Sequence, residues 1–235
     1  MSDILISEIF GPTIQGEGEL IGTPTVFVRT GGCDFHCSWC DTLYAVEKQY
    51  RDTWKKMNAA TVLDQVRTLS SDQPILVTLS GGNPALQPLG ELIESGQTLG
   101  YRFALETQGS VAQSWFHNLN VLTLSPKPPS SGMAFDAARL KACVDAAGAQ
   151  TKVTLKIVVD SDDDLRWAGD RRAEYPDIPM VLQPCNRNVG DIAPDFQTLN
   201  RKMQSLVDAV NNRKWSDVRV LPQLHVMIWG NERGV

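Results

Sequence analysis

The sequence is short of basic residues, long apolar runs and cysteine, and each shortage excludes a class of protein. Its 235 residues carry a formal net charge of −5, whereas a broad nucleic-acid surface needs clustered Lys and Arg. The longest apolar runs, such as Ile178 to Leu182, are far too short to cross a bilayer. No basic segment followed by an apolar stretch opens the chain, so we expect no signal peptide. These features predict a cytoplasmic protein that binds neither nucleic acid nor a membrane.

The chain has only five cysteines, and in a reducing cytoplasm we expect them to remain thiols. They therefore indicate metal binding, catalysis or core packing rather than disulfides. Cys143 lies on the apolar face of a predicted helix, where a free cysteine packs well. Cys185 follows a predicted strand, where it either fills a loop or lines a pocket. The other three share one short segment.

Short β-rich segments alternate along the chain with segments of helical periodicity. The predicted strands are Ile4–Ile9, Pro24–Thr30, Ile75–Ser80, Arg102–Glu106, Asn120–Ser125, Val153–Val159, Ile178–Gln183 and Val218–Leu221. Apolar residues share one face at 62–69, 140–147 and 199–210. This alternation is typical of a parallel sheet covered by helices, either an open doubly wound sheet or a barrel. Because the chain is shorter than a typical full barrel and 31–58 has no strand pattern, we predict one α/β domain over 1–235. We expect a modified, incomplete (β/α) TIM-type barrel of about six to seven βα units.

Polar or glycine-bearing segments follow almost every predicted strand. These segments are 80–84, 106–109, 125–127, 183–186 and 221–225. In parallel α/β folds the carboxyl ends of the strands meet on one face, where ligands bind. Turn chemistry explains some of the Gly and Pro, but not the recurring Glu, Thr, Lys and Gln. The pattern predicts one composite site.

Cys33, Cys37 and Cys40 have a C-x3-C-x2-C spacing directly after the predicted strand 24–30. A structural zinc usually takes four protein ligands, and no second pair of ligands follows here. A four-iron cluster on three cysteines instead leaves one iron open to the amino and carboxylate groups of S-adenosylmethionine (SAM). The reduced cluster then cleaves SAM to a 5′-deoxyadenosyl radical. The motif therefore predicts a radical SAM enzyme with a [4Fe–4S] cluster.

Two alternatives without a cluster stay open for this loop. His36 or Asp41 would complete a zinc knuckle, although the ligand count disfavours a closed site. Reduced thiols without any metal are the other alternative. A non-catalytic iron–sulfur electron carrier would also use the cysteines, but it would leave the polar segments at the other strand ends unexplained.

The segments around the cysteines resemble one family of radical SAM enzymes, the 7-carboxy-7-deazaguanine synthases. The resemblance is carried, in the family's order, by Thr13-Ile-Gln-Gly-Glu-Gly18, Phe27-Val-Arg29, Cys40-Asp-Thr42, Ser80-Gly-Gly-Asn-Pro84, Glu106-Thr107 and Ser125-Pro-Lys127. It covers most of the chain. It implies the ring contraction of 6-carboxy-5,6,7,8-tetrahydropterin to 7-carboxy-7-deazaguanine, with release of ammonia, in queuosine biosynthesis. It also implies Mg²⁺, a homodimer and a flavodoxin or ferredoxin-like electron donor. The nearest rival is a radical SAM enzyme that acts on a protein, such as a glycyl-radical activase.

The same resemblance implies a set of site residues. Substrate would be bound by Ile14, Gln15, Gly16, Glu17, Arg29 and Ser80, the first four in an N-terminal substrate-binding segment, 1–23. SAM would be bound by Trp39, Cys40, Asp41, Gly82, Ser125, Pro126, Lys127 and Gln183. The cluster would take Cys33, Cys37 and Cys40, and Thr42 would bind Mg²⁺, a cation that prefers oxygen ligands. No catalytic acid or base is predicted.

Each of these assignments has a structural alternative. Gly16 could simply make a turn that leaves Glu17 in solvent, and Lys127 could be a solvated strand-end charge. Arg29 either pairs bidentately with a substrate carboxylate or forms a structural ion pair. Asn83 stands where many radical SAM enzymes carry Glu, so its oxygen could accept from the SAM amino group without adding a charge.

The C-terminal segment 221–235 mixes aromatic, apolar and polar residues, whereas most chain ends are bland. We expect it to pack over the pocket or a dimer interface, with His225 or the terminal carboxylate near the substrate. The alternative is a docked helix whose Trp229 merely packs.

Overall fold

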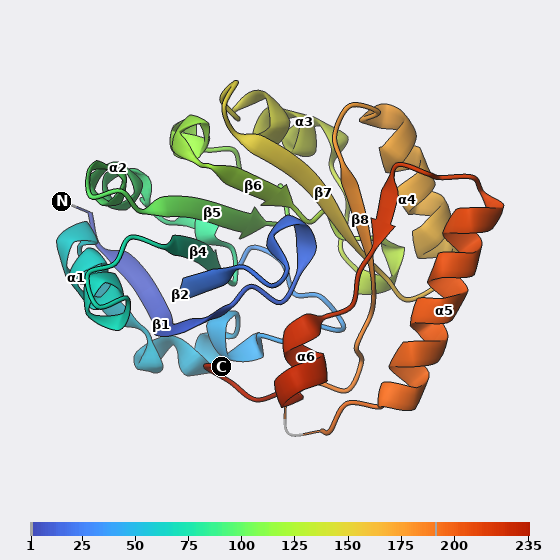
Figure 1. Cartoon of the computed structure of the whole chain (residues 1–235), viewed down its shortest axis with the longest axis horizontal. Coiled ribbons are helices and arrows are strands. Elements are labelled where there is room, and N and C mark those ends of the chain that lie inside the picture. Colours follow the sequence, from blue (N-terminus) through green and yellow to red (C-terminus); the bar gives the residue numbers. More distant parts are fainter. Residues whose placement is uncertain (1, 191) are drawn as a thin grey trace.

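In the computed structural model, which describes residues 2–190 and 192–235, nine strands form one sheet (Figure 1). In chain order they are β1 (Ile4–Ile14), β2 (Pro24–Thr30), β3 (Lys55–Met57), β4 (Leu76–Gly81), β5 (Arg102–Thr107), β6 (Val121–Leu124), β7 (Lys152–Val159), β8 (Met180–Pro184) and β9 (Val218–Val220). Across the sheet the order is β3-β1-β2-β4-β5-β6-β7-β8-β9. β1 pairs antiparallel with β2 and β3, and all the other described pairs are parallel. Met1 and Asp191, which fall within the predicted domain 1–235, lie outside the described residues.

Helices cover the outer face of this sheet (Figure 1). They are α1 (Ala59–Leu69), α2 (Gly90–Thr98), α3 (Ala137–Asp145), α4 (Asp162–Glu174) and α5 (Phe196–Asn212), whereas α6 (Leu224–Trp229) lies at the open side of the sheet. Short 3-10 helices occur at Gly18–Leu20, Leu43–Ala45, Lys48–Thr53, Pro84–Leu86, Ser114–Asn118 and Pro129–Ser131. The predicted fold class is confirmed: the sheet is mostly parallel, covered by helices and not closed into a full barrel.

Along each strand, successive side chains point alternately to the hydrophobic core and to the inner face of the sheet. Val77 and Leu79 of β4 and Leu155 and Ile157 of β7 are fully buried in the main hydrophobic cluster, against the helices. Since successive side chains point to opposite faces, their neighbours face the hollow of the curved sheet. Ser80 of β4 and the buried Lys156 of β7 are among these neighbours. The strands therefore deliver polar groups to the inside.

Two strand predictions differ from the structure. The absence of a strand in 31–58 was wrong, because β3 forms there as a short edge strand, Lys-Lys-Met, paired with the start of β1. β1 also continues to Ile14, past the predicted end at Ile9, although Gly11-Pro12 has the composition of a turn. The chain passes this point by a register shift between Phe10 and Thr13, with Gly11 at φ +122°. Only glycine adopts that conformation without strain.

The helix patterns are confirmed with two exceptions, of which the first is that α3 ends at Asp145, before the predicted face 140–147 is complete. Asp136 caps α3, accepting hydrogen bonds from the backbone of Ala138 and Arg139 at 2.9 and 3.1 Å. The second is that Val207 of α5 is 38% exposed, so it does not share the buried face of Leu206 and Val210. None of the helices within 2–190 and 192–235 has the length and hydropathy that crossing a bilayer requires.

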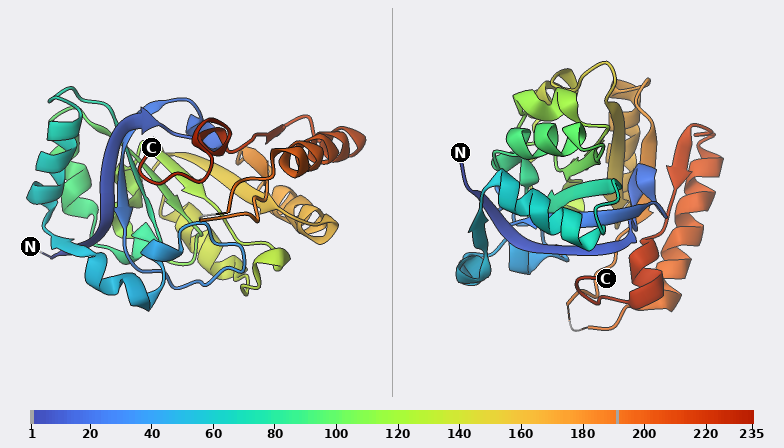
Figure 2. Two further views of the ribbon diagram at one scale, coloured as in Figure 1. Left: turned by 90° about the horizontal axis from the view of Figure 1, so that it is seen from below. Right: turned by 60° about the vertical axis from the view of Figure 1, so that its left-hand side comes forward.

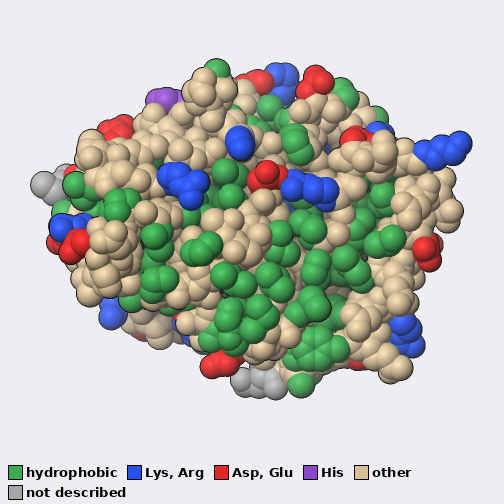
Figure 3. All heavy atoms as spheres, viewed as in Figure 1, with side chains coloured by type: hydrophobic (Ala, Val, Ile, Leu, Met, Phe, Trp, Pro, Cys, Tyr) green, Lys and Arg blue, Asp and Glu red, His purple; other side chains and the backbone are tan. Residues whose placement is uncertain are grey.

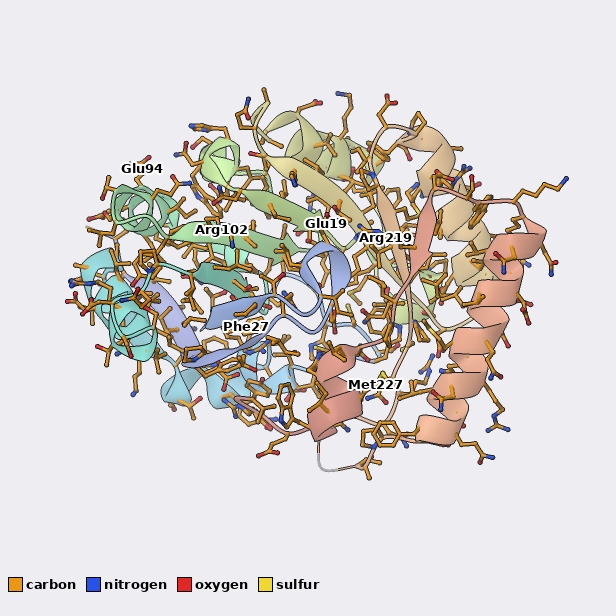
Figure 4. All side chains as sticks on the ribbon, viewed as in Figure 1. Glu19, Phe27, Glu94, Arg102, Arg219 and Met227 are labelled. Carbon is orange, nitrogen blue, oxygen red and sulfur yellow. The ribbon has the colours of Figure 1, made fainter. Side chains whose placement is uncertain are left out.

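The N-terminal loop that follows β1 and the C-terminal segment with α6 meet at the open side of the sheet (Figure 2). The backbone N–H of Leu224 donates to the carbonyl of Gly16 at 2.8 Å. Glu19, just beyond that loop, forms an ion pair with Arg219 of β9 (Figure 4). These contacts place the N-terminal loop between β2 and the last strand, over the mouth of the incomplete barrel.

Candidate active site

A cavity of about 740 Å³ opens at the carboxyl ends of the parallel strands. Every predicted site residue except Pro126 lines it, so the structure brings together Ile14, Gln15, Gly16, Glu17, Arg29, Ser80, Cys33, Cys37, Trp39, Cys40, Asp41, Thr42, Gly82, Ser125, Lys127 and Gln183. These residues come from six separate segments of the chain, and they meet because parallel strands end on the same edge. The roles of the individual residues stay predictions at this point.

The N-terminal loop carries Glu17 into the cavity. Its side chain is only 14% exposed and forms an ion pair with Lys156, and Gln223 Nε2 donates to its Oε1 at 2.8 Å. Burial alone raises the pKa of Glu17, but the charges of Lys156 and His225 and its hydrogen bonds outweigh burial and bring the pKa to about 2. Glu17 is therefore an ionised carboxylate at the cavity wall, and it does not lie in solvent.

Gly16 allows the C-terminal segment to touch this loop. A Cβ atom at Gly16 would lie 2.2 Å from His225 Nδ1, so no larger residue fits without moving the histidine. Gln15 is 8% exposed, and its Oε1 accepts from the backbone of Glu17 at 3.1 Å. The loop is therefore fixed by its own Gln15 side chain and by the His225 side chain that packs against Gly16.

Arg29 of β2 is oriented by an acidic partner. Its Nε donates to Glu8 Oε1 at 2.7 Å, and Tyr44 donates its hydroxyl to the same oxygen at 3.0 Å. No hydrogen bond within the described part of the chain uses the two Nη atoms of Arg29, which lines the cavity. Arg29 therefore forms a structural ion pair with Glu8, and its two Nη atoms remain available to bind a carboxylate.

The three cysteines of the loop after β2 all line the cavity, whereas His36 does not. His36 is 67% exposed and lies 3.9 Å from Glu47. Burial raises the pKa of all three thiols, that of Cys40 to about 12. The thiols therefore hold their protons until a metal displaces them.

The predicted SAM-binding residues lie beside this loop. Lys127 folds back to donate to the carbonyl and hydroxyl oxygens of Ser125 at 2.8 and 3.0 Å, and it lies 6.0 Å from the ring centre of Trp39. It is not a solvated strand-end charge. Gln183 is 1% exposed, and its Oε1 has no partner within the described residues. A buried amide oxygen without a donor is unfavourable by about 1–3 kcal/mol, so this position suits a ligand N–H group.

Asn83 does not lie in the cavity, where the sequence analysis expected it to bind the SAM amino group. It is fully buried, does not line the cavity, and its Oδ1 accepts from Thr107 Oγ1 at 2.7 Å and from the backbone of Ala85 at 3.1 Å. Its Nδ2 donates to Asp34 Oδ1 at 2.8 Å. The expected bond to the SAM amino group therefore has no support in this geometry, and Asn83 instead ties the segment after β4 to the cysteine loop.

Comparison with known proteins decides the family. No family model matches the chain. It is 41% identical to the 7-carboxy-7-deazaguanine synthase of Bacillus cereus over the full length of both chains. It is 43% identical to that of Bacillus subtilis, over 99% of this chain and 98% of the relative. The chain belongs to the 7-carboxy-7-deazaguanine synthase family. It is accordingly an enzyme, a lyase of the radical SAM class.

Solved structures agree with this family at the level of the fold. QueE from Escherichia coli matches with a TM-score of 0.71 over 95% of both chains, at 22% identity. SuiB from Streptococcus suis bound to S-adenosylmethionine matches with a TM-score of 0.56 over 81% of this chain, at 16% identity. Both identities are low, so these two likenesses show a shared fold.

The thiols of this family member fit an iron–sulfur cluster in their chemistry. Cys33, Cys37 and Cys40 line one cavity, whereas His36 of the same loop is 67% exposed and does not line it, so the loop is one ligand short of a closed zinc site. Among residues 2–190 and 192–235, no three His, Cys, Asp or Glu side chains converge closely enough to hold one metal ion. A cluster bound by these thiols would require the loop to bring them closer together.

The sequence analysis assigned no individual role to three side chains at this site, which are Lys156, Glu106 and Gln108. Lys156 pairs with Glu17 and Glu106, and Gln108 Nε2 donates to Cys33 Sγ at 3.6 Å. One signal was available, since Lys156 interrupts the apolar run of β7 (Lys152–Val159) with a charge. An amide or a carboxylate after a strand, as at Gln108 and Glu106, is too common to single out.

Proposed function

We propose that this chain is a 7-carboxy-7-deazaguanine synthase that converts 6-carboxy-5,6,7,8-tetrahydropterin into 7-carboxy-7-deazaguanine and ammonia, in queuosine biosynthesis. The full-length identity of 41% to the Bacillus cereus enzyme carries the proposal. The cavity supports it, because it holds a free guanidinium edge for a carboxylate at Arg29 and an ionised acceptor for ring N–H groups at Glu17. Gln15 and Ser80 add polar groups to the cavity lining.

In this proposal Cys33, Cys37 and Cys40 hold a [4Fe–4S] cluster. When bound and reduced, the cluster supplies the electron that cleaves SAM. The SAM-binding residues would be Trp39, Cys40, Asp41, Gly82, Ser125, Pro126, Lys127 and Gln183, with Pro126 set back from the cavity wall. Thr42 donates its hydroxyl to Asp41 Oδ1 at 2.6 Å, and the two oxygens form a hard donor pair that suits Mg²⁺.

We also infer a homodimer, a reduced flavodoxin or ferredoxin-like electron donor, and a cytoplasmic location. Exposed apolar side chains on α6, just before α5 and at the first residue of α5 support the homodimer, and Figure 3 shows hydrophobic side chains gathered on this face. They are Ile192, Phe196, Met227 and Ile228, at 45–60% exposure. A reducing compartment suits three thiols that must remain free for a cluster.

Anaerobic reconstitution tests the activity. The protein is loaded with iron and sulfide and then given dithionite, SAM, Mg²⁺ and 6-carboxy-5,6,7,8-tetrahydropterin. We expect 7-carboxy-7-deazaguanine and ammonia by mass spectrometry, and no product from a Cys40→Ala variant. A wild-type protein that cleaves SAM but leaves the pterin unchanged would rule out this function within the radical SAM class.

A further inference from the structure

A buried lysine lies at the floor of the cavity, between two carboxylates. Lys156 is 3% exposed and comes from the middle of β7 (Lys152–Val159). Its Nζ forms ion pairs with Glu17, from the N-terminal loop, and with Glu106, from the end of β5. All three residues line the cavity. An unpaired ammonium group would be very costly at such a depth, so the lysine and its two partners form one unit.

Each carboxylate keeps acceptor capacity beyond its bond to Lys156, because an ionised carboxylate has about four lone-pair sites. Lys156 occupies Oε2 of Glu17 and Oε1 of Glu106. Glu17 Oε1 accepts from Gln223 at 2.8 Å and lies 3.9 Å from His225 Nε2. No hydrogen bond among the described residues other than that from Lys156 involves Glu106, which is 25% exposed on the cavity wall.

Without the lysine, the two acids would compete. Two carboxylates that share a buried site repel each other, and one of them then takes up a proton. A protonated carboxyl group presents an O–H donor where the ionised form presents only acceptors. Burial alone lowers the pKa of Lys156, but the charges of Glu106 and Glu17 outweigh burial and raise it. The ammonium therefore keeps its charge, and both acids remain acceptors.

We propose that Lys156 is a positioning residue that holds Glu17 and Glu106 side by side as ionised carboxylates, so that both accept N–H groups of the substrate. This inference rests on the proposed function. A 2-amino-4-oxopyrimidine fused to a reduced ring presents N–H donors along one side, and adjacent acceptors recognise that pattern. The pair would also disfavour analogues that place acceptors along the same edge, because lone pairs would then face carboxylates.

Replacing Lys156 with Met keeps the length of the side chain and removes its charge. We expect Lys156→Met to raise KM for the pterin by at least about tenfold at neutral pH, with a smaller effect on kcat. Its kcat/KM should rise with pH across the neutral range, because one acid must first lose its proton, whereas wild-type kcat/KM stays level there. Lys152→Met, an exposed position on the same strand, is the matched control.

A second variant separates repulsion from loss of structure. In Lys156→Met/Glu106→Gln the two negative charges no longer face each other, so we expect kcat/KM to lose its pH dependence. Equilibrium binding of the stable product 7-carboxy-7-deazaguanine to each variant, measured by calorimetry between about pH 6 and 9, repeats the comparison without turnover. Thermal melting and iron content report whether each variant is folded and loaded.

The two proposals fail in different ways. A wild-type enzyme that forms no deazaguanine rejects the proposed function. If wild type is active while a folded Lys156→Met variant keeps the wild-type KM and pH profile, only the role of Lys156 is rejected. If Lys156→Met does not fold, a Glu106→Gln variant with unchanged product affinity also rejects it.

Discussion

Several side chains in and around the cavity are held in place by hydrogen bonds with neighbouring residues. Glu8 turns the guanidinium of Arg29, Ser125 anchors Lys127, and Asp34 receives the amides of Asn83 and Gln108. Bonds of this kind restrict rotamers before the ligand arrives, which reduces the entropy lost on binding. Substitution of Glu8 or Asp34, which do not line the cavity, should therefore change affinity or potential without removing a ligand contact.

We expect Gln108→Leu to lower the midpoint potential of the cluster proposed on the three cysteines. Gln108 donates an N–H to Cys33 Sγ at 3.6 Å, and hydrogen bonds to a sulfur ligand favour the reduced, more negative cluster. A reductive titration followed by electron paramagnetic resonance measures the change. Ser110→Ala is the control, because Ser110 receives a hydrogen bond from Asn83 and leaves the thiols alone. Equal potentials in wild type and Gln108→Leu would contradict this role.

The low pKa of Glu17 predicts a loss of stability in acid. Its folded-state pKa of about 2 lies below the ordinary 4.5, because Lys156 and His225 outweigh the effect of burial. The stabilisation is therefore complete above pH 4.5 and is lost as the pH falls toward about 2. Urea unfolding between about pH 5 and 3 should show a steeper decline in the free energy of unfolding for wild type than for Glu17→Gln. If the free energy of unfolding falls equally with pH in wild type and in Glu17→Gln, then Glu17 is not the source of the acid sensitivity.

At the scale of elements, the C-terminal tail after α6 lies against the N-terminal strands. Arg233 Nε lies 3.1 Å from Glu8 Oε2, and its guanidinium stacks 3.5 Å from the ring centre of Tyr44. Residues 230–235 line the cavity up to Val235. The tail is therefore a wall of the site that is held by Glu8, the same carboxylate that orients Arg29.

Removal of the Arg233 side chain should loosen the wall of the cavity that residues 230–235 form. We expect Arg233→Ala to raise KM for the pterin by about an order of magnitude through the lost ion pair and cation–π contact, with SAM cleavage retained. Arg213→Ala is the control, since Arg213 also stacks on an aromatic ring, that of Trp215 on the outside of α5. Steady-state kinetics with a bulky C-terminal tag gives a second check: unchanged turnover with the tag would contradict a closed wall.

At the scale of the whole molecule, an apolar surface stays exposed beside the cavity mouth. Met227 and Ile228 of α6 are 56% and 51% exposed, and α6 itself seats on the N-terminal loop through Leu224. A dimer formed through this face would bury α6 and so stabilise the wall of the site.

We expect light scattering to give about twice the chain mass of 25.9 kDa for wild type and a monomer for Met227→Glu/Ile228→Glu. Two buried glutamates facing their copies would be strongly unfavourable. Leu99→Glu, 47% exposed at the end of α2, is the control for a charge placed on an apolar surface elsewhere. A monomeric wild type, or a double variant that remains dimeric, would reject this interface.

The sequence by itself determined the features that depend on local patterns. Strand alternation and helical periodicity located most elements, because burial of one face repeats every two or about 3.6 residues. The cysteine spacing and the polar segments after the strands located the site, since parallel strands end on one edge. The cavity lining matches those segments closely.

Only the tertiary structure decided which charged and polar groups meet. Glu17 and Lys156 are 139 residues apart, the oxygen of Asn83 is occupied by Thr107, and β3 exists because β1 offers it an edge. Such partners are chosen by the three-dimensional course of the chain, and no short-range pattern of hydrophobicity encodes them. For the same reason Val207 remained exposed on a helix whose periodicity predicted burial.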